Sequence, residues 1–322
     1  MSRRYVAGKV LASLATLAFV VVFNFFLFRV IEGDPVGNLF RGRNLSDTQR
    51  AELTKQFGLD KSLGGQFVAY VKQTASLNFG RSYTNNQPVW EEIKHKAGPT
   101  IALVGISTLL SAVLGILAGI AAAWRRRSRT DYSLTGLTMA TYSMPDFWLG
   151  MLLLTLFGVT FGLLPVGGIV DPNSDATGIA KLADQAQHMI LPALTLTIAY
   201  LGEYTLVMRS SLIETMREDY LVLARAKGLR DALVRNRHAV PNALLPVVTL
   251  IAINFGFVLS GAIAVETIFS WPGLGLATYE ALQGPDLPML QGLFLVFSAA
   301  VIVFNLLADL LYAKLDPRVG EA

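Results

Sequence analysis

Residues 100–124 read TIALVGISTLLSAVLGILAGIAAAW and contain no charged side chain. A helix of about 20 apolar residues is long enough to cross the hydrocarbon core of a bilayer, so this stretch predicts a membrane-spanning helix. Five more runs of similar length lie at residues 10–31, 134–161, 189–208, 245–268 and 289–313. Together the runs predict an all-α, polytopic membrane protein with about six transmembrane helices.

The composition agrees with a membrane protein and excludes other classes. Hydrophobic residues make up 53% of the 322 residues and charged residues 16%, too little polar surface to cover a soluble globule. The chain has no cysteine, and His95, His188 and His238 stand far apart, so thiol chemistry is excluded and no metal site is expected. Nucleic-acid binding is not expected either, because the basic residues lie between apolar runs rather than in a stripe.

Lysine and arginine collect beside alternate ends of the apolar runs. Their clusters lie in residues 3–9, 125–129, 209–237 and 314–318. The loops 162–188 and 269–288 together contain only one lysine, Lys181, and no arginine. With six spans all four clusters fall on one side of the membrane, and the positive-inside rule places that side in the cytoplasm. We therefore expect both termini in the cytoplasm of a bacterial cell, within its inner membrane.

The predicted spans divide the chain into four parts. Residues 1–31 form an N-terminal transmembrane helix, too long for the apolar region of a signal peptide. Residues 32–98 form a small extracytoplasmic insertion, in which residues 45–53 and 66–77 predict amphipathic helices that pack on the outer ends of the spans. Residues 99–316 form a core of five helices, with a cytoplasmic segment at 212–244, and residues 317–322 are a cytoplasmic tail.

The cytoplasmic segment contains DYLVLARAKGLR at 219–230 and NRHAVPNALLP at 236–246. The first stretch is rich in helix formers and stops at a glycine, as a short capped helix does. Ala224 and Gly228 stand one turn apart, and such small residues allow a helix to seat tightly in a groove of another protein. A basic helix lying on anionic lipid explains the same residues equally well.

The sequence resembles the first permease subunit of the dipeptide, oligopeptide and nickel branch of bacterial ATP-binding-cassette importers. Gly228 and Val240-Pro241 match the spacing of the family's cytoplasmic "EAA" loop, although Val222 replaces the glutamate of that loop. Asn78-Phe79-Gly80 also departs from the commoner Gly-Asp-Leu-Gly. Other matching phrases span the chain: Gly33-Asp34-Pro35, Phe57-Gly58-Leu59-Asp60, and residues 78–82, 143–147, 164–168, 190–193, 224–229 and 266–275.

The resemblance implies a type I importer permease fold and a division of labour among subunits. Two paralogous permeases would form one translocation path, two cytoplasmic ATPases would bind ATP and Mg²⁺, and an extracytoplasmic binding protein or lipoprotein would deliver the solute. This chain would be non-catalytic, with no cofactor of its own. Peptides are the leading substrate class, with nickel chelates, glutathione or haem as alternatives.

The resemblance also implies a coupling helix, roughly residues 219–229, that rests in a groove of an ATPase. Arg225, Lys227 and Arg230 would pair there with acidic groups, although positive-inside anchoring accounts for them too. The residues expected to contact the ATPase are Asp219, Tyr220, Ala224, Arg225, Ala226, Lys227, Gly228, Leu229 and Arg230.

Several polar side chains fall within or beside the predicted spans, where they are costly and usually face the bundle interior. Candidates for the translocation path or gate are Glu203, Asn254, Glu266, Trp271 and Pro272. Asn24, Asn305 and Asp309 are further polar residues of the spans, and Asp309 is expected to pair with Lys314 or Arg318. Hydrogen bonding between helices explains the buried polar residues as well as substrate contact does, and the spacing of Gly115 and Gly119 predicts close helix packing.

Two other functional classes fit the sequence less well. A membrane-embedded enzyme needs a convergent nucleophile and base or paired metal ligands, and no predicted span contains a histidine or a plausible dyad. A secondary transporter that works alone usually has more spans and internal repeats. It would also have no need of the cytoplasmic segment 219–246.

Overall fold

The computed structural model describes residues 3–30 and 61–315, apart from the side chains at 29–30, 255–261 and 314–315. The expected helix at 45–53, the phrases Gly33-Asp34-Pro35 and Phe57-Gly58-Leu59-Asp60, and the tail 317–322 lie outside the described residues.

Within the described residues, regular structure is helical apart from one antiparallel bridge between Arg81 and Pro88. The longer helices are α1 (Arg3–Phe25), α5 (Val89–Trp124), α8 (Gly178–Thr215), α12 (Leu245–Gly261) and α15 (Leu287–Leu315). The shorter helices are α4 (Leu63–Ala75), α6 (Arg129–Tyr142), α7 (Asp146–Leu153), α9 (Asp219–Ala226), α10 (Asp231–Leu233), α11 (Val240–Ala243), α13 (Ile263–Ile268) and α14 (Leu274–Gln283). Three π-helical segments, η1 (Phe26–Val30), η2 (Leu154–Thr160) and η3 (Val234–Ala239), continue α1, α7 and α10.

The described helices account for most of the predicted membrane spans. Four of them, α1, α5, α8 and α15, are long and apolar enough to cross a membrane, and the pair α6 and α7–η2 forms a possible fifth span that bends by 99°. The sixth predicted run, 245–268, corresponds to α12, whose apolar part is shorter, and α13, with a break at Ala262. α5 and α8 begin before the apolar runs that predicted them.

The prediction of one continuous helix over residues 134–161 is wrong. α6 ends at Tyr142, and Pro145 occupies the N-cap of α7. Proline lacks a backbone N–H and disfavours the helical conformation of the residue before it, so the helix stops there and restarts in a new direction. The sequence contained this signal within an otherwise apolar run.

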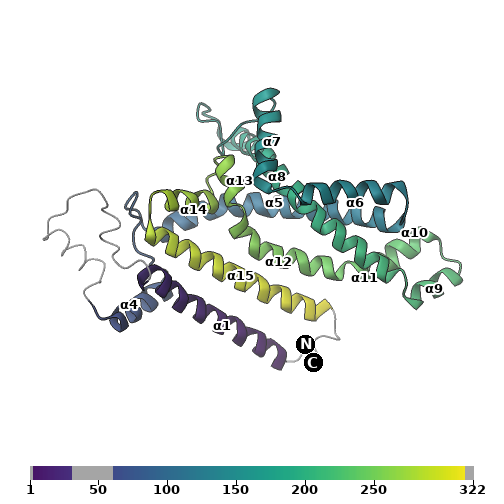
Figure 1. The fold of residues 1–322 in the computed structure, drawn as a ribbon, viewed down its shortest axis with the longest axis horizontal. Helices are drawn as coiled ribbons and strands as arrows, with labels where there is room; N and C mark the ends of the chain where they lie inside the picture. Colours follow the sequence, from purple (N-terminus) through teal and green to yellow (C-terminus); the bar gives the residue numbers. More distant parts are fainter. Residues whose placement is uncertain (1–2, 31–60, 316–322) are drawn as a thin grey trace.

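Close packing of α5 against α8 forms the centre of the molecule (Figure 1). A Cβ atom on Gly115 would lie 2.5 Å from the Cβ of Tyr204, and one on Gly119 would lie 2.7 Å from the Cβ of Met208. Gly202 in turn lies directly against the backbone of Thr138 in α6. The predicted role of the Gly115–Gly119 spacing in helix packing is therefore confirmed.

α1 packs along α15 at the edge of the bundle (Figure 1). Lys9 Nζ lies 2.9 Å from Asp309 Oδ2, so Asp309 pairs with α1. Its expected partners, Lys314 and Arg318, fall outside the described side chains. α4 covers the other end of α1, where the rings of Phe25 and Phe67 meet edge to face with centroids 5.1 Å apart. This contact agrees with the expected packing of 66–77 on a membrane helix.

We predict that Gly119→Val separates α5 from α8 and lowers the thermal unfolding midpoint of the detergent-purified protein. Overpacking of this kind costs about 1–3 kcal/mol. Gly105→Val is the matched control, because a Cβ at Gly105 of the same helix meets no atom within 4 Å. Equal midpoints for the two variants, measured by fluorescence-detected size exclusion after heating, would contradict the packing account.

Candidate functional site

The segment between α8 and α12 projects from one end of the bundle (Figure 1). α9 follows α8 after the turn at residues 216–218, and α10, η3 and α11 lead back to α12. Leu221 and Ala224 of α9 are buried in a cluster with Leu212 of α8 and with Val234 of η3. One face of α9 is therefore packed firmly against its own chain.

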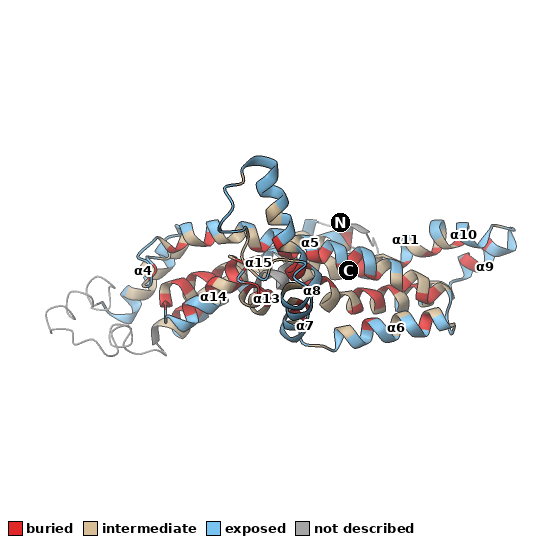
Figure 2. Cartoon of the chain, turned by 90° about the horizontal axis from the view of Figure 1, so that it is seen from above, coloured by how far each residue is buried: buried red, intermediate tan, exposed pale blue. Residues whose placement is uncertain are grey.

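The rest of the α9 surface is open and includes several apolar side chains (Figure 2). Tyr220, Val222 and Leu223 are 41%, 58% and 56% exposed. Partial desolvation raises the pKa of the Tyr220 phenol above its usual range. Asp219, Arg225, Ala226, Lys227, Gly228 and Arg230 are exposed as well. Contiguous exposed apolar side chains beyond the spans indicate a surface that another molecule covers.

Ala224 and Gly228 have different roles, although the sequence suggested one shared small face. Ala224 points into the buried cluster, so its size serves packing within this chain. Gly228 has φ +78°, and a Cβ there would meet no atom within 4 Å. Glycine is favoured at this position because the left-handed conformation ends α9, and Leu229 then turns back, half-buried, against the cluster.

The indole of Trp124, at the end of α5, joins α5 to this segment. Trp124 Nε1 donates a hydrogen bond to Asp231 Oδ2 at 3.1 Å. The guanidinium carbons of Arg225 and Arg235 lie 6.0 Å and 5.9 Å from the centroid of the indole, and Arg225 Nε is 3.9 Å from Asp231 Oδ1. Within this chain, Arg225 therefore contacts Trp124 and Asp231. No local pattern in the sequence marks Trp124, Asp231 and Arg235 as an interacting group, because Trp124 lies far from the other two in the chain.

A buried ion pair fixes the same end of the bundle. Arg209 of α8 donates from Nε to Asp131 Oδ1 at 2.6 Å and from its terminal nitrogen to Oδ2 at 2.9 Å. The Arg127 N–H and the Thr135 hydroxyl also donate to this carboxylate, whose side chain is 3% exposed. The sequence placed Arg209 only in a cytoplasmic cluster, although Asp131 stands out as an acid beside four arginines.

Glu266 links three helices at the opposite end of α5. Its carboxylate accepts hydrogen bonds from the Thr100 hydroxyl at 2.7 Å and from the backbone N–H groups of Gly275 at 2.7 Å and Leu276 at 3.1 Å. Both N–H groups belong to the first turn of α14, where donors lack partners within the helix and the dipole favours negative charge. Gly273 lies directly against the carboxylate and Thr100. Glu266 therefore serves as a helix cap and interhelical joint.

Trp271 belongs to this joint, whereas Glu203 and Asn254 form another one. The buried Trp271 donates from its indole N–H to the Pro99 carbonyl at 3.0 Å and from its backbone N–H to the Glu266 carbonyl at 2.8 Å, and Pro272 beside it is half-buried. Asn254 of α12 donates to Glu203 of α8 at 3.0 Å.

The predicted path residues thus separate into two groups. Glu203 lies at the level of Gly115 of α5, because its neighbour Tyr204 packs against that glycine. Glu266 lies at the level of Thr100 of α5, to which it is hydrogen-bonded. Those two positions on α5 are roughly 22 Å apart along a helix. Asn24 bonds across helices too, donating to the Gln291 carbonyl at 3.2 Å, and Asn305 is half-buried.

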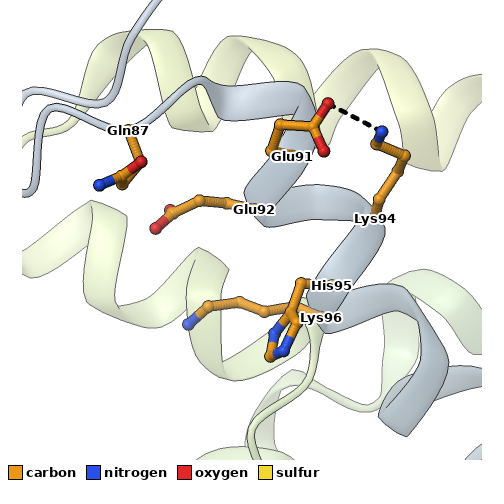
Figure 3. Close-up of a pocket in the computed structure, with 6 residues that line it drawn as sticks. All are labelled: Gln87, Glu91, Glu92, Lys94, His95 and Lys96. Carbon is orange, nitrogen blue, oxygen red and sulfur yellow. Dashed lines mark hydrogen bonds and ion pairs between the residues drawn. The ribbon is translucent and has the colours of Figure 1, made fainter.

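The first turns of α5 border an open hollow of ≈ 580 Å³ with side chains of both signs (Figure 3). Lys94 pairs with Glu91 at 2.8 Å, Lys96 pairs with Glu280 of α14 at 3.2 Å, and Glu92 accepts a hydrogen bond from Asn85. Gln87 and His95 complete the lining. These charges are largely compensated within the chain, and the described residues contain no group of three or more side chains suited to hold a metal ion.

Long apolar helices, interhelical polar joints and an exposed connecting helix together define a multi-pass helical membrane protein. The family model for the inner-membrane component of binding-protein-dependent transport systems matches residues 115–321, and the model for the N-terminal part of such membrane components matches residues 2–104. The chain belongs to this family and is a permease subunit of the inner membrane.

Characterised relatives match over almost the whole chain. The di/tripeptide transport system permease protein of Pseudomonas aeruginosa is 36% identical, with 98% of each chain covered. The dipeptide transport system permease protein of Escherichia coli K12 is 38% identical, covering 93% of this chain and 94% of the relative. The glutathione transport system permease protein of the same organism is 37% identical, with 98% of each covered.

We predict that Arg209→Leu destabilises the protein by less than the loss of about 3–5 kcal/mol that is typical of breaking a fully buried ion pair. The Asp131 carboxylate loses its charged partner but keeps the Arg127 N–H and the Thr135 hydroxyl as donors. The double variant Asp131→Asn/Arg209→Leu should recover most of this loss. Arg126→Leu is the control for the charge change, since Arg126 is exposed. Denaturant unfolding in detergent measures all four proteins, and a single variant no less stable than the control would refute the assignment.

Proposed function

We propose that this chain is the permease subunit of an ATP-driven peptide importer and forms one half of its translocation path. This proposal rests on the exposed apolar side chains of α9, Tyr220, Val222 and Leu223, which lie beyond the spans and are 41%, 58% and 56% exposed. A helix presented in this way fits a groove on a cytoplasmic ATP-binding subunit. Family membership and the relatives' substrates support the rest of the assignment.

The proposed assembly contains a second, paralogous permease, two ATP-binding subunits and an extracytoplasmic binding protein or lipoprotein. ATP and Mg²⁺ would bind to the ATP-binding subunits, and this chain would take no part in hydrolysis. Movement of α9 on ATP binding would alter the bundle only if α9 contacts the ATPase differently in the two states. Asp219, Lys227 and Arg230 are exposed on or beside α9 and are available for charged contacts with that subunit.

We propose that both termini are cytoplasmic. The start of α1 and the end of α15 lie together, joined by Lys9 and Asp309, toward the end of the molecule that carries α9 (Figure 1). The basic residues 125–129 lie at that end as well, because the Asp131–Arg209 pair joins the start of α6 to the end of α8. The clustering of basic residues at one end supports this orientation.

Peptides are the proposed substrate class, and glutathione is the second candidate. Two of the relatives named above carry di- or tripeptide transport in their names, and one carries glutathione transport. Purified complexes in nanodiscs, supplied with delivery protein loaded with dipeptides, tripeptides or glutathione, should hydrolyse ATP faster only with the cognate solute. Stimulation by none of the three would contradict this substrate class.

We predict that Gly228→Glu abolishes import while the unfolding midpoint of the bundle stays unchanged. Gly228→Asn should retain much of the activity, because asparagine tolerates the left-handed conformation found here better than other residues do. Uptake of labelled peptide into proteoliposomes and co-elution of the ATP-binding subunits measure the two effects. Normal import by the Gly228→Glu variant would refute the assignment of α9 as the coupling helix. Association of α9 with lipid alone would appear as a complex without ATP-binding subunits.

A further inference from the structure

α9 is short and needs a connection to the bundle beyond its chain neighbours if it is to move other helices. Its buried residues Leu221 and Ala224 belong to a cluster formed mainly by the end of α8 and the returning segment η3–α11, which are close in the chain, and reached by Ala123 of α5. α5 is different, because more than 90 residues separate Trp124 from α9. Among the described residues, every hydrogen bond and ring contact between α5 and the segment 219–243 involves Trp124.

The contacts of Trp124 reach both α9 and the returning part of the segment, η3. Arg225 belongs to α9, whereas Arg235 belongs to η3, and both guanidinium groups lie over the same indole. Asp231, at the start of α10 between them, accepts the hydrogen bond of the indole N–H and lies near Arg225. An aromatic face attracts cations and an indole N–H requires an acceptor, so one side chain satisfies three partners from three elements.

We propose that Trp124 is a positioning residue that clamps the α9–α10 unit to the end of α5 through Arg225, Asp231 and Arg235. A displacement of α9 then reaches α5 directly, and α5 carries α8 with it because Gly115 and Gly119 hold the two helices in contact. The inference rests on the proposed function, in which α9 meets an ATP-binding subunit. Without the clamp, α9 remains folded on its buried face, and only the apolar cluster that includes Ala123 connects it to α5.

Two variants of Trp124 separate the parts of the clamp. Trp124→Leu removes both the aromatic face and the N–H donor, and Trp124→Phe keeps the face and removes the donor. Trp90→Leu is the matched control, because Trp90 lies at the other end of α5 with Lys94 5.9 Å from its ring centroid. If Trp124→Leu fails to assemble, Arg235→Gln removes one cation from the ring and should give a smaller change in the same direction.

The first measurement is the position of the segment relative to α5. Because this chain has no cysteine, spin labels attach to it only at Leu117→Cys and Ala232→Cys, both exposed positions, and the labelled chain is then assembled with its partners into the full complex. Trp124→Leu should broaden the distance distribution between the labels, and Trp90→Leu should leave it as in the parent. A distribution that stays narrow without Trp124 overturns the clamp, whatever the partners of α9 are.

The second measurement is the number of ATP molecules hydrolysed per labelled alanine dipeptide imported into proteoliposomes. Trp124→Leu should raise this ratio at least about fivefold, the lower range of a lost coupling free energy, with Trp124→Phe between it and the wild type. An unchanged ratio refutes the clamp even if overall activity falls. Absence of ATP-binding subunits from the wild-type complex refutes the proposed function instead. In that case the distances between the spin labels still test whether Trp124 holds the segment to α5.

Discussion

The close approach of α5 and α8 is the constraint on which the rest of the described structure depends. Lipid solvates apolar side chains as well as a neighbouring helix does, so membrane helices associate through van der Waals contact and polar bonds rather than through the hydrophobic effect. Gly115 and Gly119 make such contact possible along α8. The Asp131–Arg209 pair then adds α6 at one end, and Glu266 adds α13 and α14 at the other.

The buried polar residues act chiefly as joints between these helices. The Glu266 carboxylate accepts hydrogen bonds from the Thr100 hydroxyl of α5 and from backbone N–H groups in the first turn of α14. The Glu203–Asn254 hydrogen bond connects α8 with α12. An unpaired polar group in a membrane is costly, so each carboxylate has partners in the helices around it. Solute selectivity therefore does not follow from these residues, and the substrate proposal rests on the relatives.

The cytoplasmic segment combines a fixed face with an open one. Leu221 and Ala224 anchor α9, while Tyr220, Val222 and Leu223 remain exposed for a partner. The cation–π contacts around Trp124 are each worth about 0.5–1 kcal/mol at exposed sites, and the Arg225–Asp231 ion pair about 1 kcal/mol or less. Contacts of this size orient an element without preventing its rearrangement, which suits a part of the protein that must differ between two states.

The sequence by itself determined the all-α membrane class, most of the spans and the glycine that ends α9, because apolar length, basic flanks and a left-handed turn are local properties. Pro145 also marked its break locally, but the 99° direction of the bend did not follow from it. Only the tertiary structure decided that Asp131 meets Arg209, that Glu266 meets Thr100, and that Trp124 meets Asp231. Each of these pairs joins elements far apart in the chain. Their contacts depend on how whole helices dock, which no local period or spacing encodes.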